Sequence, residues 1–309
     1  MRVLVTGGAG FIGSHTVARL LAEGHSVRVL DDLSTGKREN LAPFGGAVEF
    51  LEGDITDVAA VERAVAGMDA VMHLAAVVSV PVSVERTAFA HAVNATGTLN
   101  VLEAARRAGV RRVAYASSAA VYGAIADLPA REEAPLVPTS PYGSQKRYNE
   151  ETARLATELH GLETVGLRYF NVYGPRQDPR SPYSGVLSIF IDRILGDQPV
   201  TIHGDGLQTR DFVFVGDVAR ANVAALTAPG GSGRAFNVGT GTAVTVLDAY
   251  RAIACSVGRE VEPTFGPGRA GDIRHSRADV GAIARELGWQ AGVAFEGGIG
   301  ETIAWRRGP

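Results

Sequence analysis

The chain has 309 residues, of which 46% are hydrophobic and 20% charged, a balance typical of globular rather than disordered proteins. Its formal net charge of −3 argues against a nucleic-acid partner, for which a basic surface is expected. The only cysteine, Cys255, excludes an intrachain disulfide, and neither a signal peptide nor a bilayer-spanning run is recognisable. We therefore expect a cytoplasmic protein without a membrane partner.

The first half of the chain alternates short apolar runs with helical patterns. Strands are predicted at 3–6, 27–30, 48–51, 70–74, 112–117 and 164–169, and helices near 12–23, 87–108 and 142–160. Buried runs of this length that alternate with helices are typical of βαβ units and a parallel sheet. The chain is therefore predicted to be an α/β protein with a Rossmann-type doubly wound parallel sheet.

The alternating strand and helix pattern ends after Tyr169, where Pro175, Pro179 and Pro182 interrupt a polar stretch. Helices are then predicted near 186–195, from Asp217 onward, and near 245–257, 279–287 and 295–306. Further strands are predicted at 200–203 and 212–215. The sequence contains no internal repeat, and its seven histidines are scattered, so no metal site is expected.

A glycine-rich turn follows the first predicted strand and opens the first predicted helix. Gly7, Gly10 and Gly13 permit a tight turn, and the helix N-terminus offers free N–H groups to phosphates. Asp31 ends the second strand, where a carboxylate accepts hydrogen bonds from ribose hydroxyls and repels a 2′-phosphate. The pattern predicts a dinucleotide site and favours NAD over NADP.

Tyr142 and Lys146 lie four residues apart in a predicted helix and therefore share one face. Lys146 is one of only two lysines among 30 basic residues. A free phenol is a poor base at neutral pH, but a nearby ammonium favours the phenolate. Ser118 follows the fifth strand, at the sheet edge where ligands bind, and can share a substrate hydroxyl with Tyr142.

Together, the glycine turn, Ser118 and the Tyr142-x-x-x-Lys146 pair resemble the extended branch of the short-chain dehydrogenase/reductase superfamily. The resemblance runs nearly from end to end and implies a smaller C-terminal α/β substrate domain. It implies an NAD-binding domain of residues 1–171 with about 213–238. The nucleotide-sugar domain would then comprise about 172–212 with 239–309.

The resemblance also implies which residues touch each ligand. The cofactor residues are Gly7, Gly10, Phe11, Ile12, Gly13, Asp31, Asp32, Leu33, Ser34, Thr35, Gly36, Asp54, Ile55, Leu74, Ala75, Ala76, Asn94, Tyr142, Lys146, Tyr169 and Phe170. The substrate residues are Ser118, Tyr142, Asn171, Val186, Thr201, His203, Arg210, Arg269, Asp272 and Ser276. Within this set, Arg210-Asp211-Phe212 and Arg269-x-x-Asp272 resemble a clamp for uridine diphosphate, since arginine forks match diphosphate oxygens.

The residues after Ser118 discriminate between reactions within this branch. Nucleotide-sugar dehydratases carry an Asp and a Glu here as the acid and base for loss of water, whereas this chain has Ala119 and Ala120. What remains is hydride and proton transfer, as in the UDP-hexose 4-epimerases of the branch. The resemblance therefore implies an isomerase of galactose and carbohydrate metabolism that epimerises UDP-glucose and UDP-galactose through a 4-keto intermediate.

Two further expectations follow from the resemblance. Ser276 stands at a position that bounds the sugar pocket, and its small side chain predicts room for the acetamido group of UDP-GlcNAc or UDP-GalNAc. The helices near 87–108 and 142–160 are expected to pair across a homodimer. Among the alternatives, a UDP-glucuronate 4-epimerase would need a cation for the sugar carboxylate, a reductase would need exchangeable cofactor, and a non-catalytic NAD sensor would not need the tyrosine–lysine pair.

Overall fold

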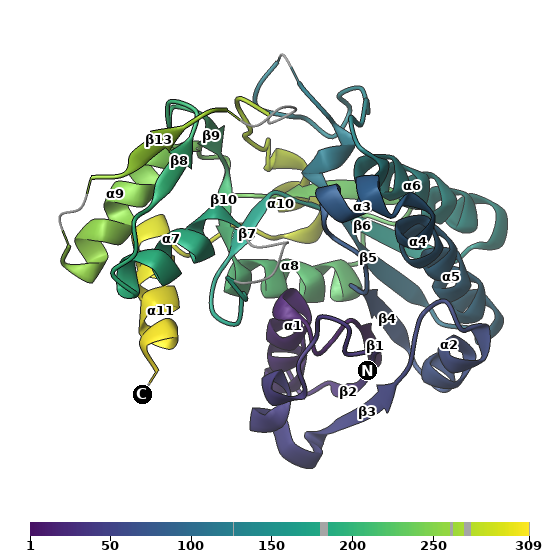
Figure 1. The fold of residues 1–309 in the computed structure, drawn as a ribbon. Coiled ribbons are helices and arrows are strands. Elements are labelled where there is room, and N and C mark those ends of the chain that lie inside the picture. Colours follow the sequence, from purple (N-terminus) through teal and green to yellow (C-terminus); the bar gives the residue numbers. More distant parts are fainter. Residues whose placement is uncertain (126, 180–184, 260–261, 269–272, 309) are drawn as a thin grey trace.

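The computed structural model describes residues 1–125, 127–179, 185–259, 262–268 and 273–308. Seven strands, all parallel, form its main sheet in the order β11-β6-β5-β4-β1-β2-β3 (Figure 1). They are β1 (Arg2–Thr6), β2 (Ser26–Asp31), β3 (Val48–Glu52), β4 (Ala70–His73), β5 (Arg112–Ser118), β6 (Glu163–Tyr169) and β11 (Arg234–Val238). The strand order reverses direction between β1 and β4, which confirms the doubly wound fold.

Helices cover both faces of this sheet (Figure 1). One face packs against α1 (Phe11–Ala22) and α8 (Val215–Thr227), and the other against α2 (Val58–Val65), α5 (Gly97–Arg107) and α6 (Pro141–His160). Along β1, Val3 and Val5 enter the core shared with α1 and α8, whereas Leu4 enters the core shared with α2 and α5. Because side chains alternate along a strand, one apolar run fills both layers.

Helix α6 has sequence signals at both ends. The Ser140 hydroxyl accepts a hydrogen bond from the N–H of Gly143 at 3.1 Å, and Pro141 occupies the first turn, where its missing N–H costs nothing. Gly161 ends the helix in the left-handed conformation. These signals place Tyr142 in the first turn, next to the carboxyl end of β5.

The helix predicted near 87–108 is interrupted. It consists of α4 (Thr87–His91), one turn of π-helix, η3 (Ala92–Thr96), and then α5. The sequence analysis also missed α2, β11 and α3 (Val80–Glu85), the last of which begins with Ser79 as its cap and a proline in its first turn. Single turns complete this part: η1 (Arg38–Asn40), η2 (Ala42–Ala47) and η4 (Ala119–Val121).

A second, smaller core lies beside the sheet. It is built by α7 (Val186–Leu195), α9 (Val246–Val257) and α11 (Phe295–Arg307). Short strand pairs border it: β7 (Asn171–Tyr173) with β10 (Phe212–Phe214), β8 (Thr201–His203) with β13 (Thr264–Gly266), and β9 (Thr209–Arg210) with β12 (Val244–Thr245). Helix α10 (Gly281–Leu287) packs back onto β11 of the large sheet. The division into a cofactor domain and a substrate domain stays a proposal.

No helix within the described ranges combines the length and apolar character needed to cross a membrane.

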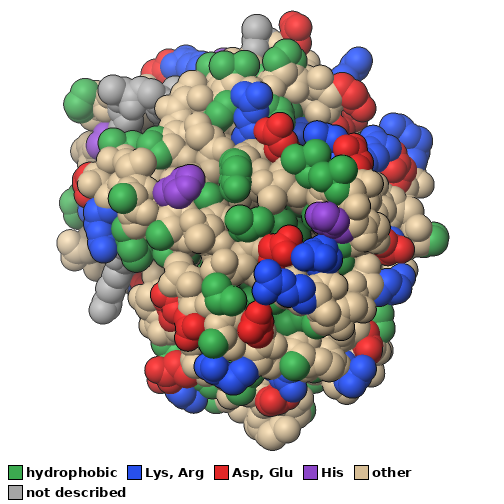
Figure 2. Space-filling model, turned by 90° about the vertical axis from the view of Figure 1, so that its right-hand side faces the viewer, with side chains coloured by type: hydrophobic (Ala, Val, Ile, Leu, Met, Phe, Trp, Pro, Cys, Tyr) green, Lys and Arg blue, Asp and Glu red, His purple; other side chains and the backbone are tan. Residues whose placement is uncertain are grey.

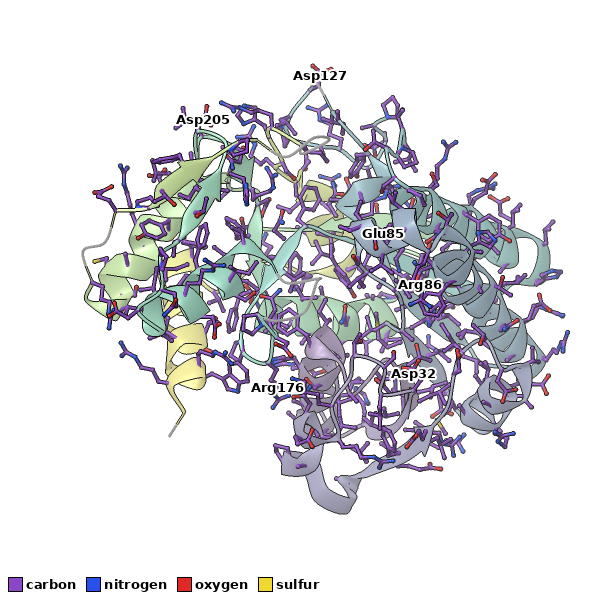
Figure 3. The ribbon with its side chains drawn as sticks, viewed as in Figure 1. Asp32, Glu85, Arg86, Asp127, Arg176 and Asp205 are labelled. Atoms are coloured by element: carbon purple, nitrogen blue, oxygen red, sulfur yellow. The ribbon has the colours of Figure 1, made fainter. Side chains whose placement is uncertain are left out.

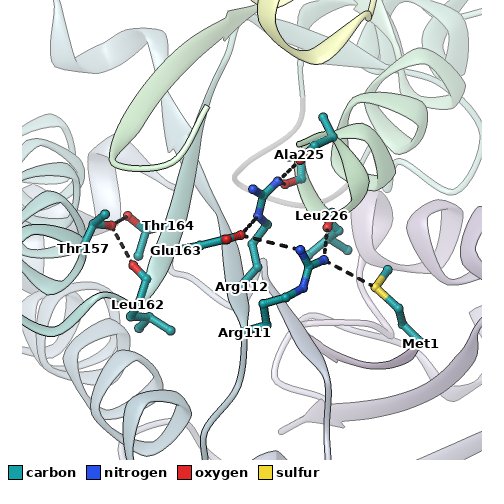
Figure 4. Close-up of polar contacts among 10 residues, drawn as sticks. Met1, Arg111, Arg112, Thr157, Leu162, Glu163, Thr164, Ala225 and Leu226 are labelled. Atoms are coloured by element: carbon teal, nitrogen blue, oxygen red, sulfur yellow. Dashed lines mark hydrogen bonds and ion pairs between the residues drawn. The ribbon is translucent and has the colours of Figure 1, made fainter. Parts of the chain in front are cut away.

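Arg112, at the start of β5, is buried with only 1% of its surface exposed. Its Nε donates to the Glu163 carboxylate at 2.6 Å, and its Nη1 donates to the backbone carbonyls of Ala225 and Ala228 at the end of α8 (Figure 4). Arg112 adjoins Arg111 and has the sequence pattern of a solvated cation, but it is buried because α8, far away in sequence, covers it.

We expect Arg112→Ala to lower the free energy of unfolding by about 2 kcal/mol, because it leaves Glu163 and two helix-end carbonyls without their donor. Arg111→Ala is the matched control, since the Arg111 side chain is 54% exposed and its loss should change stability little. Urea unfolding of both variants measures the difference. Equal stability of the two variants would contradict the role given to Arg112.

Candidate active site

The backbone of the glycine turn between β1 and α1 is packed so tightly that a side chain would not fit at Gly7 or Gly13. Gly7 adopts a left-handed φ of +70°, and a Cβ there would lie 2.7 Å from the backbone nitrogen of Ala75. A Cβ on Gly13 would lie 2.0 Å from the carbonyl oxygen of Gly7. Helix α1 begins at Phe11 after Gly10, and no side chain caps it. Its first N–H groups therefore lack a side-chain partner, as at helix N-termini that bind phosphates.

The first turn of α1 also touches both parts of the molecule. Phe11 and Ile12 pack against the smaller core, while the rest of the helix packs on the sheet. On the same helix, His15 hydrogen-bonds to the carbonyl oxygen of Pro175 at 2.9 Å. In Figure 3, Arg176 lies beside α1, Asp32 near the large sheet and Asp205 in the smaller part. The predicted cofactor cradle therefore lies where the two cores meet.

Asp31, at the end of β2, is 6% exposed and organises the loop that follows it. Its carboxylate accepts hydrogen bonds from the N–H of Ala9 and the N–H of Leu33, each at 2.9 Å. Burial raises the pKa of Asp31, and these two hydrogen bonds oppose that rise. Each carboxylate oxygen keeps a further lone pair with which to accept a ribose hydroxyl.

The rest of that loop folds around Asp31. A Cβ on Gly36 would lie 2.7 Å from the Asp31 carboxylate, so a side chain here would meet the acid. Asp32 instead accepts hydrogen bonds from the N–H and hydroxyl of Ser34, within its own turn. The structure thus brings the predicted residues from Asp31 to Gly36, Thr35 among them, to the edge of the glycine turn.

The predicted cofactor residues after β3 and β4 reach the same edge of the sheet. Asp54 is exposed and accepts the N–H of Thr56 at 2.8 Å, while Ile55 is buried. The segment Leu74-Ala75-Ala76 is held by Thr6, whose hydroxyl accepts the N–H groups of Leu74 and Ala75.

Asn94 lies in the π turn and connects three segments. Its side-chain amide exchanges hydrogen bonds with the backbone of Val77, at 2.8 and 2.9 Å, and donates to Gln145 of α6 at 2.8 Å. π turns are frequent at functional sites because they re-aim a side chain. Here the turn ties the segment after β4 to the helix that carries Tyr142.

Tyr169 and Phe170, at the end of β6, are both buried. The Tyr169 hydroxyl donates to Asn222 of α8 at 2.6 Å, so it points into the protein. Phe170 packs in a small cluster with Tyr122 and Ala278. Any contact of these two residues with a ligand would therefore be made by their backbone or ring edges.

Ser118, Tyr142 and Lys146 meet at the carboxyl ends of β5 and β6. The Lys146 Nζ lies 5.8 Å from the centre of the Tyr142 ring and donates to the carbonyl oxygen of Ala116 at 2.8 Å. Tyr142 is hydrogen-bonded to Ser118, whose Oγ also accepts the N–H of Ala120. The three residues therefore form one cluster at the edge of the sheet.

Burial acts in opposite directions on the two ionisable members of this cluster. Desolvation raises the pKa of Tyr142 to about 12, against the hydrogen bond from Ser118. Desolvation lowers the pKa of Lys146 to about 8, against the negative charge of Glu150. The phenol is therefore neutral at pH 7, and a base role for this residue would require nearby positive charge.

The turn η4 after Ser118 brings no carboxylate to this cluster. Its residues are Ala119, Ala120 and Val121. A Cβ on Gly143, next to Tyr142, would lie 2.6 Å from the carbonyl oxygen of Ala120, so the turn packs directly against α6. The position next to Tyr142 that would serve elimination is thus filled by backbone and methyl groups.

A cavity of about 590 Å³ lies in the smaller part, between α7, β8, β9 and the start of α9. Five predicted substrate residues line it: Asn171, Val186, Thr201, His203 and Arg210. Ser118 and Tyr142 do not line it, so the substrate site predicted from the sequence has two centres. Arg269 and Asp272 lie outside the described residues.

Ser276 lies between the two centres. Two backbone hydrogen bonds hold its segment. The carbonyl oxygen of Arg277 accepts the N–H of Ala130, and the carbonyl oxygen of Arg274 accepts the N–H of Thr209. Ala130 follows the loop after β5, and Thr209 adjoins the cavity. Ser276 is partly buried in this bridge.

Three side chains at the site have functions that the sequence analysis did not identify. Asp211, expected in the diphosphate clamp, is fully buried, and its carboxylate accepts N–H groups from Thr240, Gly241 and Ala278, so it ties the segment after β9 to these loops. Gln208 lines the cavity with a buried Oε1 that has no partner. Glu150 lies one turn beyond Lys146, a spacing that could have been noticed.

Among the residues that the structure describes, no group of three or more His, Cys, Asp or Glu side chains converges to hold a metal ion.

Comparison with known proteins gives consistent matches over the whole chain. The model of the NAD dependent epimerase/dehydratase family matches residues 3–239. The UDP-glucose 4-epimerase of Mycolicibacterium smegmatis is 45% identical over 312 residues, covering 99% of each chain.

Two solved structures are also similar over nearly the whole of both chains. The UDP-glucose 4-epimerase of Thermotoga maritima with UDP-glucose is 39% identical with a TM-score of 0.95, covering 99% of each chain. The Thermus thermophilus UDP-glucose 4-epimerase in complex with NAD is 42% identical with a TM-score of 0.91, covering 100% of this chain and 99% of that chain.

The Asp31 carboxylate is expected to set the preference for NAD over NADP. Asp31→Asn keeps the size of the side chain and removes its charge, so the ratio of the NADP to the NAD dissociation constant should fall about tenfold or more. Glu39→Gln is the matched control, because Glu39 is an exposed carboxylate of η1 outside the predicted cofactor residues. Calorimetric titration of the apo protein measures both ratios, and an unchanged ratio in Asp31→Asn would refute the assignment.

Proposed function

The chain belongs to the NAD dependent epimerase/dehydratase family, and from this premise we propose that it interconverts UDP-glucose and UDP-galactose by epimerisation at C4 of the sugar. The observation that carries the proposal is the cluster of Ser118, Tyr142 and Lys146 next to a turn that holds no carboxylate. The cluster supports oxidation and reduction of a sugar alcohol. The missing acid and base argue against loss of water, the other chemistry in the family name.

Each residue of the cluster would have its own role in the oxidation and reduction at C4 of the sugar. Ser118, hydrogen-bonded to Tyr142, orients the 4-hydroxyl of the sugar. Tyr142 takes the proton of that hydroxyl and later returns it, while the charge of Lys146 favours the phenolate. NAD, when bound, supplies the acceptor for the C4 hydride and gives it back. The sugar passes through a 4-keto intermediate and turns about its link to the diphosphate between the two transfers.

The cavity lined by Asn171, Val186 and Arg210 is suited to the nucleoside diphosphate of this substrate. Its volume of about 590 Å³ falls in the range of ligand sites, and Arg210 offers a guanidinium to phosphate oxygens. Holding the diphosphate here keeps the 4-keto intermediate bound while the sugar rotates. Retention of this kind makes the second hydride transfer effectively intramolecular.

We further propose that the protein is a cytoplasmic homodimer that pairs through α5 and α6. Exposed apolar side chains support this interface: Val84, Phe89, Leu99, Tyr148, Leu155 and Leu159 lie on α3 to α6. Tyr148, Leu155 and Leu159 form one stripe along α6. Figure 2 faces this side of the molecule and shows apolar groups spread between the charged ones.

Light scattering on Leu155→Arg tests this interface. We expect a dimer for the unmodified chain and a monomer for the variant. Val137→Arg is the control, because Val137 is an exposed apolar residue outside these helices. A monomeric unmodified chain, or a variant that stays dimeric, would overturn the interface.

We expect Tyr142→Phe to reduce kcat for UDP-galactose roughly a hundredfold or more, since the ring stays in place and only the proton-transferring hydroxyl is lost. Binding of UDP-glucose, measured by calorimetry, should change little. The paired measurement separates chemistry from binding. Turnover close to that of the unmodified chain would show that Tyr142 is not the base.

We expect Ser276→Tyr to lower the ratio of UDP-GlcNAc to UDP-glucose activity about tenfold or more, because a phenol would fill the room for the acetamido group. Activity on UDP-glucose should persist. Steady-state assays on both substrates give the ratio. If the ratio does not move, Ser276 does not bound the sugar pocket.

A further inference from the structure

Helix α6 carries a third ionisable residue on the same face as Tyr142 and Lys146. Glu150 follows Lys146 by four residues and Tyr142 by eight, so the three lie in one row along the helix. All three are buried: Lys146 is 3% exposed and Glu150 is 8% exposed. A carboxylate buried one turn from a buried ammonium calls for an explanation, because each charge would cost several kcal/mol if left alone.

Glu150 is held at a fixed place by two neighbouring strands. The hydroxyl of Ser117, on β5, donates to its Oε1 at 2.5 Å. Arg168, on β6, donates to both carboxylate oxygens, from Nε at 2.9 Å and from Nη2 at 2.8 Å. Glu150 is thus anchored to the end of β5, one turn of α6 from Lys146.

Arg168 is fixed in turn by contacts outside this pair. Its Nη1 donates to the hydroxyl of Tyr122 at 2.7 Å and to the carbonyl oxygen of Glu132 at 2.9 Å. Burial opposes its charge, but the hydrogen bonds and charge of Glu150 outweigh that effect and raise the pKa of Arg168. The guanidinium therefore stays charged and cannot turn toward Lys146.

At neutral pH, the charged side chains that act on Lys146 are Glu150 and Arg168. Among the described residues, the other titratable groups that face Lys146, Tyr142 or Glu150 from neighbouring strands are His73, Tyr115 and Tyr169. Burial lowers the pKa of His73 to about 3 and raises the pKa of both tyrosines well above the ordinary value, so all three are neutral. The Glu150 carboxylate is then the anion that acts on Lys146, and Arg168 is the cation that limits its effect.

We propose that Glu150 is a positioning residue that keeps Lys146 in its ammonium form inside the protein, with Arg168 holding the carboxylate in place. The inference rests on the proposed function, in which Lys146 must be charged to favour the Tyr142 phenolate. Burial alone moves Lys146 toward the neutral amine, in which form it would no longer lower the pKa of Tyr142. Glu150 counteracts this loss without touching the substrate.

The chain offers a direct measurement of the Lys146 charge, because it contains only two lysines, Lys37 and Lys146. Lys37→Arg keeps a cation opposite Asp178, its ion-pair partner at 2.8 Å, and leaves Lys146 as the only lysine. Lysine labelled with ¹³C at Cε then gives one side-chain signal. Its chemical shift as a function of pH reports the pKa of Lys146, in a background where it is expected near 8.

In this background we compare three substitutions. Glu150→Gln should lower the pKa of Lys146 by about one pH unit, and Arg168→Gln should raise it, since the first removes an anion and the second a cation. Ser117→Ala breaks a hydrogen bond of the same cluster but removes no charge, so it should leave the pKa where it was. The alkaline limb of kcat for UDP-galactose should follow the Lys146 pKa in each variant.

A lower Lys146 pKa in Glu150→Gln together with a higher Lys146 pKa in Arg168→Gln supports the proposal. General loosening of the site would shift the pKa in the same direction in both variants. A folded Glu150→Gln variant with an unmoved Lys146 pKa overturns it, as does a shift of equal size in Ser117→Ala. If Glu150→Gln does not fold, the Arg168→Gln variant decides. A higher Lys146 pKa in this variant supports the proposal, and an unchanged pKa overturns it. The titration needs no substrate, so failure of the chain to epimerise UDP-galactose would refute the proposed function and leave this measurement valid.

Discussion

Two ionisable groups are withdrawn from water at the centre of this protein, and most of the site follows from that constraint. A phenol and an ammonium both resist burial in their charged forms, yet sugar oxidation by this route needs the phenolate beside the ammonium. Burial holds the pKa of Tyr142 near 12 and that of Lys146 near 8. Under the proposed function, positive charge added at the sheet edge would favour the phenolate, so proton removal would depend on the oxidised cofactor.

The parallel sheet supplies the place for this arrangement. Because the strands run in one direction, the glycine turn after β1, Asp31 at the end of β2 and Ser118 at the end of β5 all lie at one edge. The smaller core adds a cavity next to that edge, and α1 contacts both cores through its first turn. The glycine turn, the cluster of Ser118, Tyr142 and Lys146, and the cavity are thus separate parts brought together by topology, and the segment around Ser276 bridges the last two.

The sequence predicts the parts of this site that depend on local pattern. The glycine turn with its downstream acid, and the tyrosine–lysine spacing, are readable because their geometry is set within a few residues or one βαβ unit. Burial imposed by distant segments is not readable. Arg112 looks like its solvated neighbour until α8 covers it, and Asp211 looks like a ligand residue until the loops at 240–241 and 278 occupy its carboxylate. Glu150 is intermediate: its spacing is local, but its partner Arg168 comes from another strand.

The most direct test of the account is to incubate the purified protein with UDP-galactose, without added cofactor, and to follow UDP-glucose while assaying for copurified NAD and for released NADH. We expect conversion to an equilibrium mixture with no net NADH, since each hydride removed is returned. Conversion that consumes NAD in proportion to product would contradict it, and so would the absence of any conversion when NAD is supplied in excess.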